Sequence, residues 1–327
     1  MPALITHALF GEEALAALPA GIIEDDEQRQ AFIVGNQGPD PMFFRWGGVL
    51  SNTRACLKMG RRLHHERMTS AFTWLRDGVS HLPSADAGIG RAFALGMLGH
   101  YTLDRTAHPY VYAHEYKVVD LGEGMEDGEG EVHAIEEADI DSAMLWRRRG
   151  LSTSACHPAS VLACSDRTMT VAGALVSQMV LGAFGEEFGA TWYAQCLGDM
   201  RKVYQVIEPA GSTGAQLIGS LERGVRSHSL VQSLAHRVVS DGESPWMNDV
   251  HETWFDPFSG ASSTESFEEV FDRALAGWPE VAHAFIEGLD LQAMTGHRDY
   301  SGCVLDADEA PMPKERELFR PFKGLSL

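Results

Sequence analysis

The sequence predicts an all-α protein. Apolar residues recur at helical spacing along most of the 327 residues, and no run alternates Val, Ile, Thr and aromatic residues as a sheet would require. Gly-Pro, Pro-Asp, Ser-Gly and Asp-Gly pairs interrupt this pattern and indicate turns. Helices are expected over 8–18, 26–34, 54–77, 87–108, 132–148, 167–184, 189–207, 213–239, 266–276 and 278–290.

The composition limits the partners that the protein can bind. With 26 Lys and Arg against 46 Asp and Glu, the formal net charge is −20. Such a surface repels phosphate polymers and anionic membranes, so we predict no nucleic-acid-binding patch. The charge of a phosphorylated substrate would have to be met locally, by metal ions or by a few arginines.

Targeting signals are not evident in the sequence. No Lys or Arg precedes Arg29, so the first residues do not resemble a signal peptide, and the longest apolar run, 171–184, is too short for a transmembrane segment. We therefore expect a cytoplasmic protein. The five cysteines are scattered singly, without a CxxC pair, which argues against a disulfide framework or a cysteine zinc site.

The stretch GHYTLDRTAHPY, 99–110, carries His100, Asp104 and His108 at steps of four. An α-helix turns about 100° per residue, so this spacing keeps all three side chains on one stripe. The apolar residues upstream predict a buried helix, and Pro109 predicts that it ends or bends there. Buried imidazoles and carboxylates must be paired, metal-bound or solvated in a cleft.

Further segments repeat these residue types. In EVHAIEEADID, His133 and Glu137 are four apart on a second predicted helix. In GPDP, two prolines flank Asp40 and hold its backbone extended. The other candidates are His7 in THALFG and the neighbours His64 and His65 in LHHE, only one of which can point a given way on a helix.

Imidazole and carboxylate are the ligands that zinc uses in catalytic sites, where three protein ligands leave a position for water. No HExxH motif and no His-Asp dipeptide is found, which argues against two other classes of metal hydrolase. We divide the chain into a metal-site helical core, 1–150, and an additional helical half, 151–327, packed on it in the same domain. The acidic, Gly-rich segment 118–132 is expected to be a solvated connector.

Taken in order, THALFG, GPDP, LHHE, HYTLDRTAHPY and HAIEEADID resemble the bacterial zinc-dependent phospholipase C family, which includes phospholipases of the alpha-toxin type. The likeness is greatest to an uncharacterised branch without signal peptides, and it covers residues 1 to about 150. It implies a multi-helical bundle of the type shared with single-strand-specific nucleases. It does not extend to a β-sandwich membrane-binding module in 151–327.

The resemblance implies a site with two or three zinc ions. Asp40, His100, Asp104 and either His64 or His65 would bind one ion, and His108, His133 and Glu137 another. His7, with Asp104 bridging, matches the third. Secreted members complete that third site with an N-terminal Trp, whereas MPALIT precedes His7 here. Asp40 is also the candidate general base that positions the attacking water.

Outside the ligands, we expect three carboxylates to accept the free N–H groups of the ligating histidines: Glu136, Asp139 and Asp141. The expected function is hydrolysis of a phosphodiester, either a small molecule or a phospholipid, in the manner of a phospholipase C. Three alternatives stay open. They are a phosphoesterase or nuclease with the same trinuclear site, a helical protein that zinc stabilises without turnover, and core histidines without metal.

Overall fold

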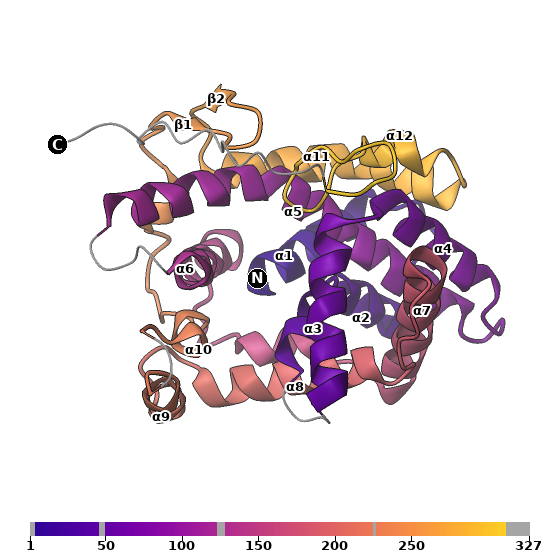
Figure 1. Cartoon of the computed structure of the whole chain (residues 1–327), viewed down its shortest axis with the longest axis horizontal. Helices are drawn as coiled ribbons and strands as arrows, with labels where there is room; N and C mark the ends of the chain where they lie inside the picture. Colours follow the sequence, from indigo (N-terminus) through magenta and orange to yellow (C-terminus); the bar gives the residue numbers. More distant parts are fainter. Residues whose placement is uncertain (1–3, 46–49, 123–127, 225–226, 312–327) are drawn as a thin grey trace.

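The longest helix of the described residues, α5 (Ala87–Leu121), packs against helices from both halves of the chain. A computed structural model describes residues 4–45, 50–122, 128–224 and 227–311. Its fold is mostly helical with one two-stranded sheet, which confirms the prediction of an all-α class. Figure 1 shows α11 (Phe267–Ile286) lying along α5, while α8 (Trp192–Ile207) runs along the opposite edge of the molecule.

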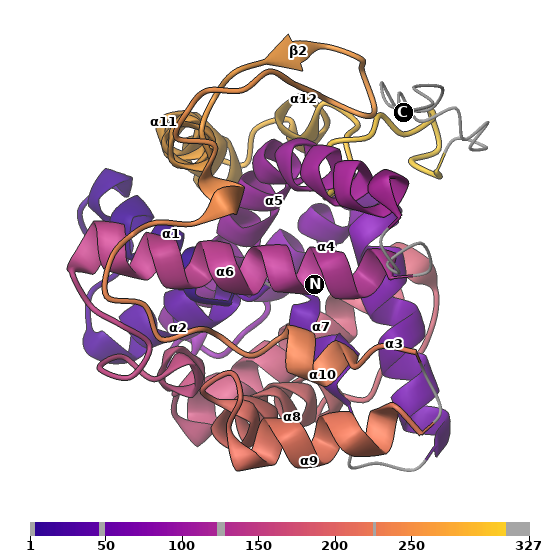
Figure 2. The ribbon, with the colours of Figure 1, turned by 90° about the vertical axis from the view of Figure 1, so that its left-hand side faces the viewer.

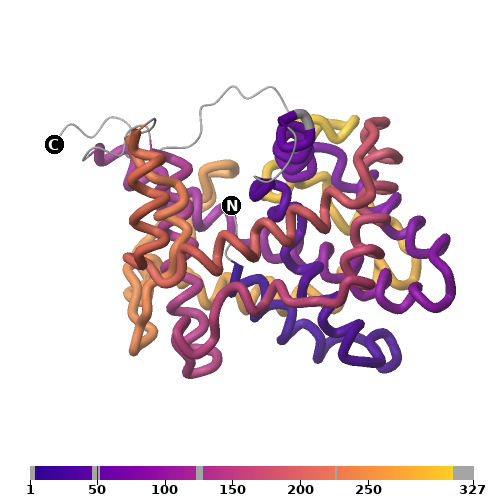
Figure 3. Tube along the Cα trace, turned by 90° about the horizontal axis from the view of Figure 1, so that it is seen from below, coloured from indigo at the N-terminus to yellow at the C-terminus, as the bar shows by residue number. Residues whose placement is uncertain are grey.

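The helices α8 and α9 (Thr213–Glu222) lie on the side of the molecule away from α5 (Figure 1). Figure 2 shows α6 (Glu129–Arg149) between α5 and the pair formed by α8 and α9. Figure 3 shows α9 and α7 (Asp166–Phe184) at opposite sides of the molecule, seen from below. The other helices are α1 (Leu4–Ala14), α2 (Asp26–Gly35), α3 (Leu50–His65), α4 (Met68–Ser80), α10 (Leu230–Ser233) and α12 (Leu291–Thr295). Short 3-10 helices are η1 (Leu15–Ala17), η2 (Asp40–Phe44), η3 (Pro158–Leu162) and η4 (Pro245–Met247). Strands β1 (Trp254–Phe255) and β2 (Ser262–Ser263) pair antiparallel.

Glycines allow α2 and α5 to cross at very short distance. A Cβ atom on Gly35 would lie 2.4 Å from the Phe93 carbonyl oxygen, and one on Gly96 would lie 2.2 Å from that of Phe32. Any larger residue would force the two backbones apart. This crossing brings the end of α2 and the start of η2 against the middle of α5, where His100 lies.

One connected hydrophobic core contains buried side chains from both 1–150 and 151–311. The indole of Trp278 on α11 donates a 3.1 Å hydrogen bond to the Ala14 carbonyl, and its ring packs against Phe10 and Phe32. The helix α11 therefore packs against α1, α2 and α5. Among the described helices, none combines the length and the apolar character that a membrane-spanning segment needs.

Several helix boundaries differ from the sequence-based expectation. The segment 54–77 divides between α3 and α4, and the segments 266–276 and 278–290 join across Pro279 into α11. The helix α5 continues through Pro109 to Leu121 instead of ending there. Of the expected loop 118–132, the ends belong to α5 and α6, and 123–127 lie outside the described residues.

Candidate metal centre

Asp40, His64 and His100 form the first of three groups of potential metal ligands. Asp40 begins η2, His64 lies in the last turn of α3, and His100 is in the middle of α5. His64 Nε2 lies 2.9 Å from Asp40 Oδ1, and His100 Nε2 lies 3.8 Å from Asp40 Oδ2. All three residues are buried, and one ligand atom of each lies within 4.8 Å of the others. The donor set fits a divalent ion such as zinc.

Gly38 permits this approach of η2 to α5. Its φ is +53°, and a Cβ atom there would lie 2.2 Å from Cδ2 of the His100 ring. Only glycine has both the backbone freedom and the small volume for this position. The sequence GPDP therefore fits the site in two ways, because its glycine makes room for His100 and its aspartate supplies a ligand.

His7, His100 and Asp104 form the second group. His7 Nε2 lies 3.0 Å from Asp104 Oδ1, and His100 Nε2 lies 3.0 Å from Asp104 Oδ2. The rings of His7 and His100 stack with their centroids 3.9 Å apart. Asp104 therefore presents one oxygen to a residue of α1 and the other to a residue of its own helix. Such a carboxylate is placed to bridge two ions.

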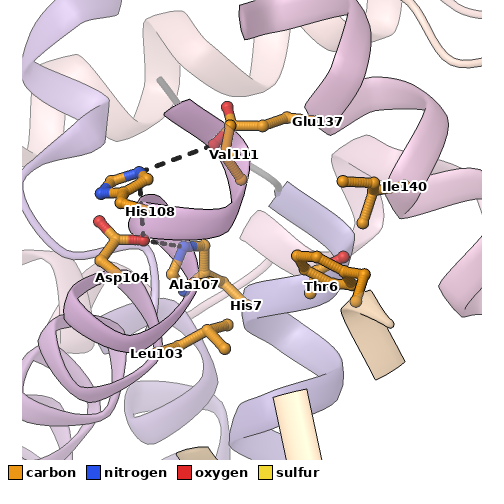
Figure 4. A pocket seen from close by; sticks show the side chains of 10 residues that line it. Thr6, His7, Leu103, Asp104, Ala107, His108, Val111, Glu137 and Ile140 are labelled. Atoms are coloured by element: carbon orange, nitrogen blue, oxygen red, sulfur yellow. Dashed lines mark ion pairs between the residues drawn. The ribbon is translucent and has the colours of Figure 1, made fainter. Parts of the chain in front are cut away.

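His108, His133 and Glu137 form the third group. His133 Nε2 lies 3.2 Å from Glu137 Oε1, and His108 Nε2 lies 3.8 Å from the same oxygen. His108 Nε2 is also 3.8 Å from Asp104 Oδ1, which connects this group to the second. Figure 4 shows His7, Asp104, His108 and Glu137 facing one another around a small cavity. The three groups are thus parts of one buried centre.

The outward ring nitrogens of four histidines have acceptors that fix their orientation. A main-chain carbonyl only accepts hydrogen bonds, so an Nδ1 atom facing one must carry the hydrogen and leave Nε2 as the potential ligand atom. The Nδ1 atoms of His64, His100 and His108 lie 2.7–2.9 Å from the carbonyls of Gly60, Asn36 and Tyr300, respectively. His133 Nδ1 lies 2.8 Å from Glu115 Oε2. Histidines that bind metals are held in this way.

Two inward ring nitrogens lie close to carboxylates but are poorly aligned with them for a hydrogen bond. His100 Nε2 is 3.0 Å from Asp104, and His133 Nε2 is 3.2 Å from Glu137, yet neither nitrogen has a hydrogen-bond partner among the described residues. Buried polar atoms are nearly always satisfied, because an unpaired one costs about 1–3 kcal/mol. The same nitrogens are the ones that the ring orientation makes available to an ion. The residues present therefore fit a bound metal.

Burial and charge divide the histidines into two kinds. Burial opposes the charged form of His100, but the carboxylates of Asp104 and Asp40 outweigh burial and raise the pKa to about 9. The pKa of His133 is likewise about 9, because the nearby Glu137 carboxylate outweighs burial. Burial lowers the pKa of His7 and of His64. In the metal-free centre, the rings of His100 and His133 are therefore doubly protonated at neutral pH, and a bound ion would displace one proton from each.

The carboxylates of Asp104 and Asp40 carry the negative charges that balance the protonated ring of His100. Burial alone would raise the pKa of Asp104, but the surrounding imidazoles, His100 first, hold it well below its usual range. The pKa of Asp40 is lowered in the same way, with His100 again the main opponent of burial. Both carboxylates are therefore ionised and ready to bind a cation.

Of the two neighbours on α3, the structure turns His64 inward and His65 outward. The His65 side chain is 41% exposed, and its Nδ1 lies 3.1 Å from Asp299. The sequence leaves open which of the two is the candidate metal ligand, and the structure favours His64.

The three carboxylates expected to support the ligands have other neighbours. Asp139 contacts Arg237 and Ser244, and Asp141 binds the start of α1 and His236. Glu136 is buried without a hydrogen-bond partner among the described residues. The ring N–H groups of the candidate ligands instead face three main-chain carbonyls and Glu115.

Sequence reasoning missed Glu115 and Tyr300. Glu115 lies seven residues after His108, two helical turns along, so the stripe of α5 could have revealed it had the helix not been expected to end at Pro109. Tyr300 acts through its main-chain carbonyl, which has no sequence signal. Comparisons of the chain with protein-family models, curated proteins and solved structures find no match.

Proposed function

We propose that the protein is a zinc-dependent hydrolase that cleaves phosphodiesters in the manner of a phospholipase C, with the helical fold that this family shares with the single-strand-specific nucleases. The observation that carries the proposal is the convergence of eight buried donor residues from five elements in three adjoining groups. The order of the sequence motifs along the chain supports the same family. Each group contains at most three protein donors, with His100 common to two groups, and this leaves coordination positions for water and substrate.

A single Nε2 atom binds only one ion, so the two groups that contain His100 must divide their ligands. We assign His100 to the ion held by Asp40 and His64, and His7 with Asp104 to a second. His108, His133 and Glu137 would hold a third. Zinc in such a site lowers the pKa of a bound water to about 7 and offsets phosphate charge.

The protein's own residues have distinct tasks in this proposal. Asp40 is buried and ionised, and it can accept a hydrogen bond from the attacking water and orient it. His64 Nε2, 2.9 Å from Asp40, limits the positions that this carboxylate can take. Glu115 and the three carbonyls fix the remaining rings, so little reorganisation is needed when substrate binds.

The acidic surface favours a small or lipid phosphodiester over a nucleic acid. A net charge of −20 gives no general attraction for a polyanion, so the binding of phosphate would depend on the centre itself. The test is to purify the protein, measure zinc by elemental analysis, and assay a chromogenic phosphodiester, phosphatidylcholine vesicles and single-stranded DNA before and after chelation. We expect zinc-dependent cleavage of the first two. Cleavage of DNA alone would indicate the nuclease alternative.

Thermal unfolding separates catalysis from a purely structural role for zinc. A chelated protein that stays folded but loses activity, and regains it with zinc, supports the proposal. If chelation unfolds the chain and the zinc-loaded protein hydrolyses no phosphodiester, zinc is structural. Absence of bound zinc would remove the proposal altogether.

A further inference from the structure

His236, which follows α10, lies between two buried carboxylates outside the candidate metal centre. Its Nε2 is 3.0 Å from Asp141 Oδ2, and its Nδ1 is 2.5 Å from Glu208 Oε1. The three side chains are at most 2% exposed. Glu208 also accepts hydrogen bonds from the backbone N–H of His236, which fixes the position of the ring.

Each ring nitrogen of His236 faces a carboxylate, and both nitrogens donate when the two carboxylates are ionised. An ionised carboxylate only accepts hydrogen bonds, and a neutral imidazole has one N–H, so it can satisfy one of its two partners. A doubly protonated ring satisfies both and leaves one net negative charge where there would otherwise be two. Burial lowers the pKa of His236, but its bonds to Asp141 and Glu208 outweigh burial and raise the pKa to about 9.

Asp141, one of these two carboxylates, also binds the N-terminus of α1. Its two oxygens accept hydrogen bonds from the backbone N–H groups of Ile5 (2.8 Å) and Thr6 (2.7 Å), in the first turn of α1. The first N–H groups of a helix have no partner within the helix, and a carboxylate there is stabilised by the helix dipole. His7 is the next residue. Asp141 therefore holds in place the first turn of α1, the turn that carries His7.

His7 depends on this anchor more than the other histidines of the centre do. The Nδ1 atoms of His64, His100, His108 and His133 each have an acceptor. The buried Nδ1 of His7 has no hydrogen-bond partner among the described residues. Among the described residues the His7 ring is held by its stack on His100 and its contact with Asp104, so its position depends on where α1 lies.

We propose that His236, as an imidazolium, is a positioning residue for the candidate ligand His7. It holds the Asp141 carboxylate against the first N–H groups of α1, and α1 in turn presents His7 to Asp104. This rests on the proposed function in one respect, namely that an ion is bound at His7. Without the imidazolium, Asp141 and Glu208 would repel each other in a buried space, and one of them would take up a proton or turn away.

The test compares His236→Gln with His7→Gln and the unmodified protein. We measure bound zinc per chain and the hydrogen exchange of the Ile5 and Thr6 amides. His236→Gln should lower zinc to the content of His7→Gln and speed exchange of both amides at least about tenfold, with amides in the middle of α5 unchanged. In His7→Gln, where Asp141 is intact, the two amides should remain protected. This contrast separates a loosened α1 from mere loss of the ion.

Two results of this comparison would overturn the proposal. One is His236→Gln with the zinc content and amide protection of the unmodified protein. Another is His7→Gln that loses no zinc, because no ion would then depend on His7, although the other two groups could still serve the proposed hydrolase. If unmodified protein binds no zinc, the proposed function fails, whereas the amide exchange still tests whether His236 anchors α1.

A measurement on the unmodified protein covers the case in which His236→Gln does not fold. Nitrogen NMR of the imidazoles at pH 7 reports whether each ring carries one proton or two. The proposal requires two on His236. A neutral His236 ring at pH 7 is the third result that would overturn it.

Discussion

The main-chain carbonyl of Tyr300 accepts the Nδ1 hydrogen of His108 at 2.8 Å. The backbone N–H of Tyr300 in turn donates to the His64 carbonyl at 3.1 Å. A single residue near the C-terminus therefore contacts two candidate ligands on different helices, α5 and α3. The segment 298–303 thus helps to build the centre, although its sequence has no metal-binding motif.

Gly302 is the residue that lets this segment dock. Its φ is +80°, and a Cβ atom would lie 2.9 Å from the carbonyl oxygen of Arg105, the group that Pro109 leaves without its helical donor. We expect Gly302→Ala to lower the free energy of unfolding by about 1–3 kcal/mol and to weaken zinc binding. Gly288→Ala is the control, because its φ is +70° but its Cβ would meet nothing within 4 Å. Equal effects of the two substitutions on zinc binding would contradict this role of Gly302.

Glu115 should tune the affinity of the third group for zinc. Its Oε2 lies 2.8 Å from His133 Nδ1 and holds the ring so that Nε2 faces Glu137. Loss of such a partner costs about 10–100-fold in metal affinity. We expect Glu115→Ala to show this loss in competition with a chelator. Glu115→Gln keeps an acceptor and should lose less, so an equal loss in both would show that charge, and not orientation, is what Glu115 supplies.

The adjacent histidines of α3 give a matched pair of substitutions. His64→Gln should lose one zinc ion and at least about a hundredfold in activity, because its Nε2 lies beside Asp40. His65→Gln changes the same residue type one position away, where the side chain is 41% exposed and faces Asp299. We expect the zinc content of His65→Gln to be unchanged. The reverse pattern would assign the ligand to His65.

Zinc affinity should rise with pH up to about 9. In the metal-free protein the pKa values of His100 and His133 are raised to about 9 by neighbouring carboxylates, so both rings are protonated at pH 7. Binding must displace these protons, and the penalty shrinks as the pH approaches 9. His7 and His64, with lowered pKa values, add no such penalty. Chelator competition between pH 6.5 and 9 tests this, and an affinity that does not change over that range would contradict it.

The same raised pKa values predict the opposite trend for stability without metal. A group whose pKa is raised on folding stabilises the protein fully below its unfolded value, about 6.5, and this contribution disappears as the pH rises through 9. His236 belongs to this class, with Asp141, Glu208 and the ring of Tyr204 facing it. We expect the unfolding free energy of chelated protein to fall from pH 6.5 to 9. Urea unfolding at several pH values measures this free energy. An unfolding free energy that rises from pH 6.5 to 9 would contradict the charged state of these histidines.

Parts of the site could be predicted because they follow helix geometry alone. The steps of four in 100–108 and 133–137 determine which side chains share a face, whatever surrounds the helix. The rotation that distinguishes His64 from His65 depends on how α3 packs, so spacing could not decide it. Asp141 could be recognised as an important carboxylate, but its partners Ile5, Thr6 and His236 are distant in sequence.

Long-range contacts also explain the helix boundaries that the sequence misplaces. The predicted helix 54–77 breaks at Arg67, whose φ is +57°, because the main chain and side chain of Glu309 bind the backbone N–H groups of Arg67, Thr69 and Ser70. This carboxylate caps α4 from more than two hundred residues away. Local propensity has no information on such a cap. The helical class was predictable because it depends on periodicity, which is local.

The most direct test of the metal centre is the anomalous X-ray scattering of zinc in crystals of the purified protein, recorded on both sides of the zinc absorption edge. We expect a peak among Asp40, His64 and His100, one beside His108, His133 and Glu137, and one between His7 and Asp104, each about 2.0–2.2 Å from its ligand atoms. Zinc-loaded crystals with no peak among these residues, or with zinc only on the surface, would contradict this expectation.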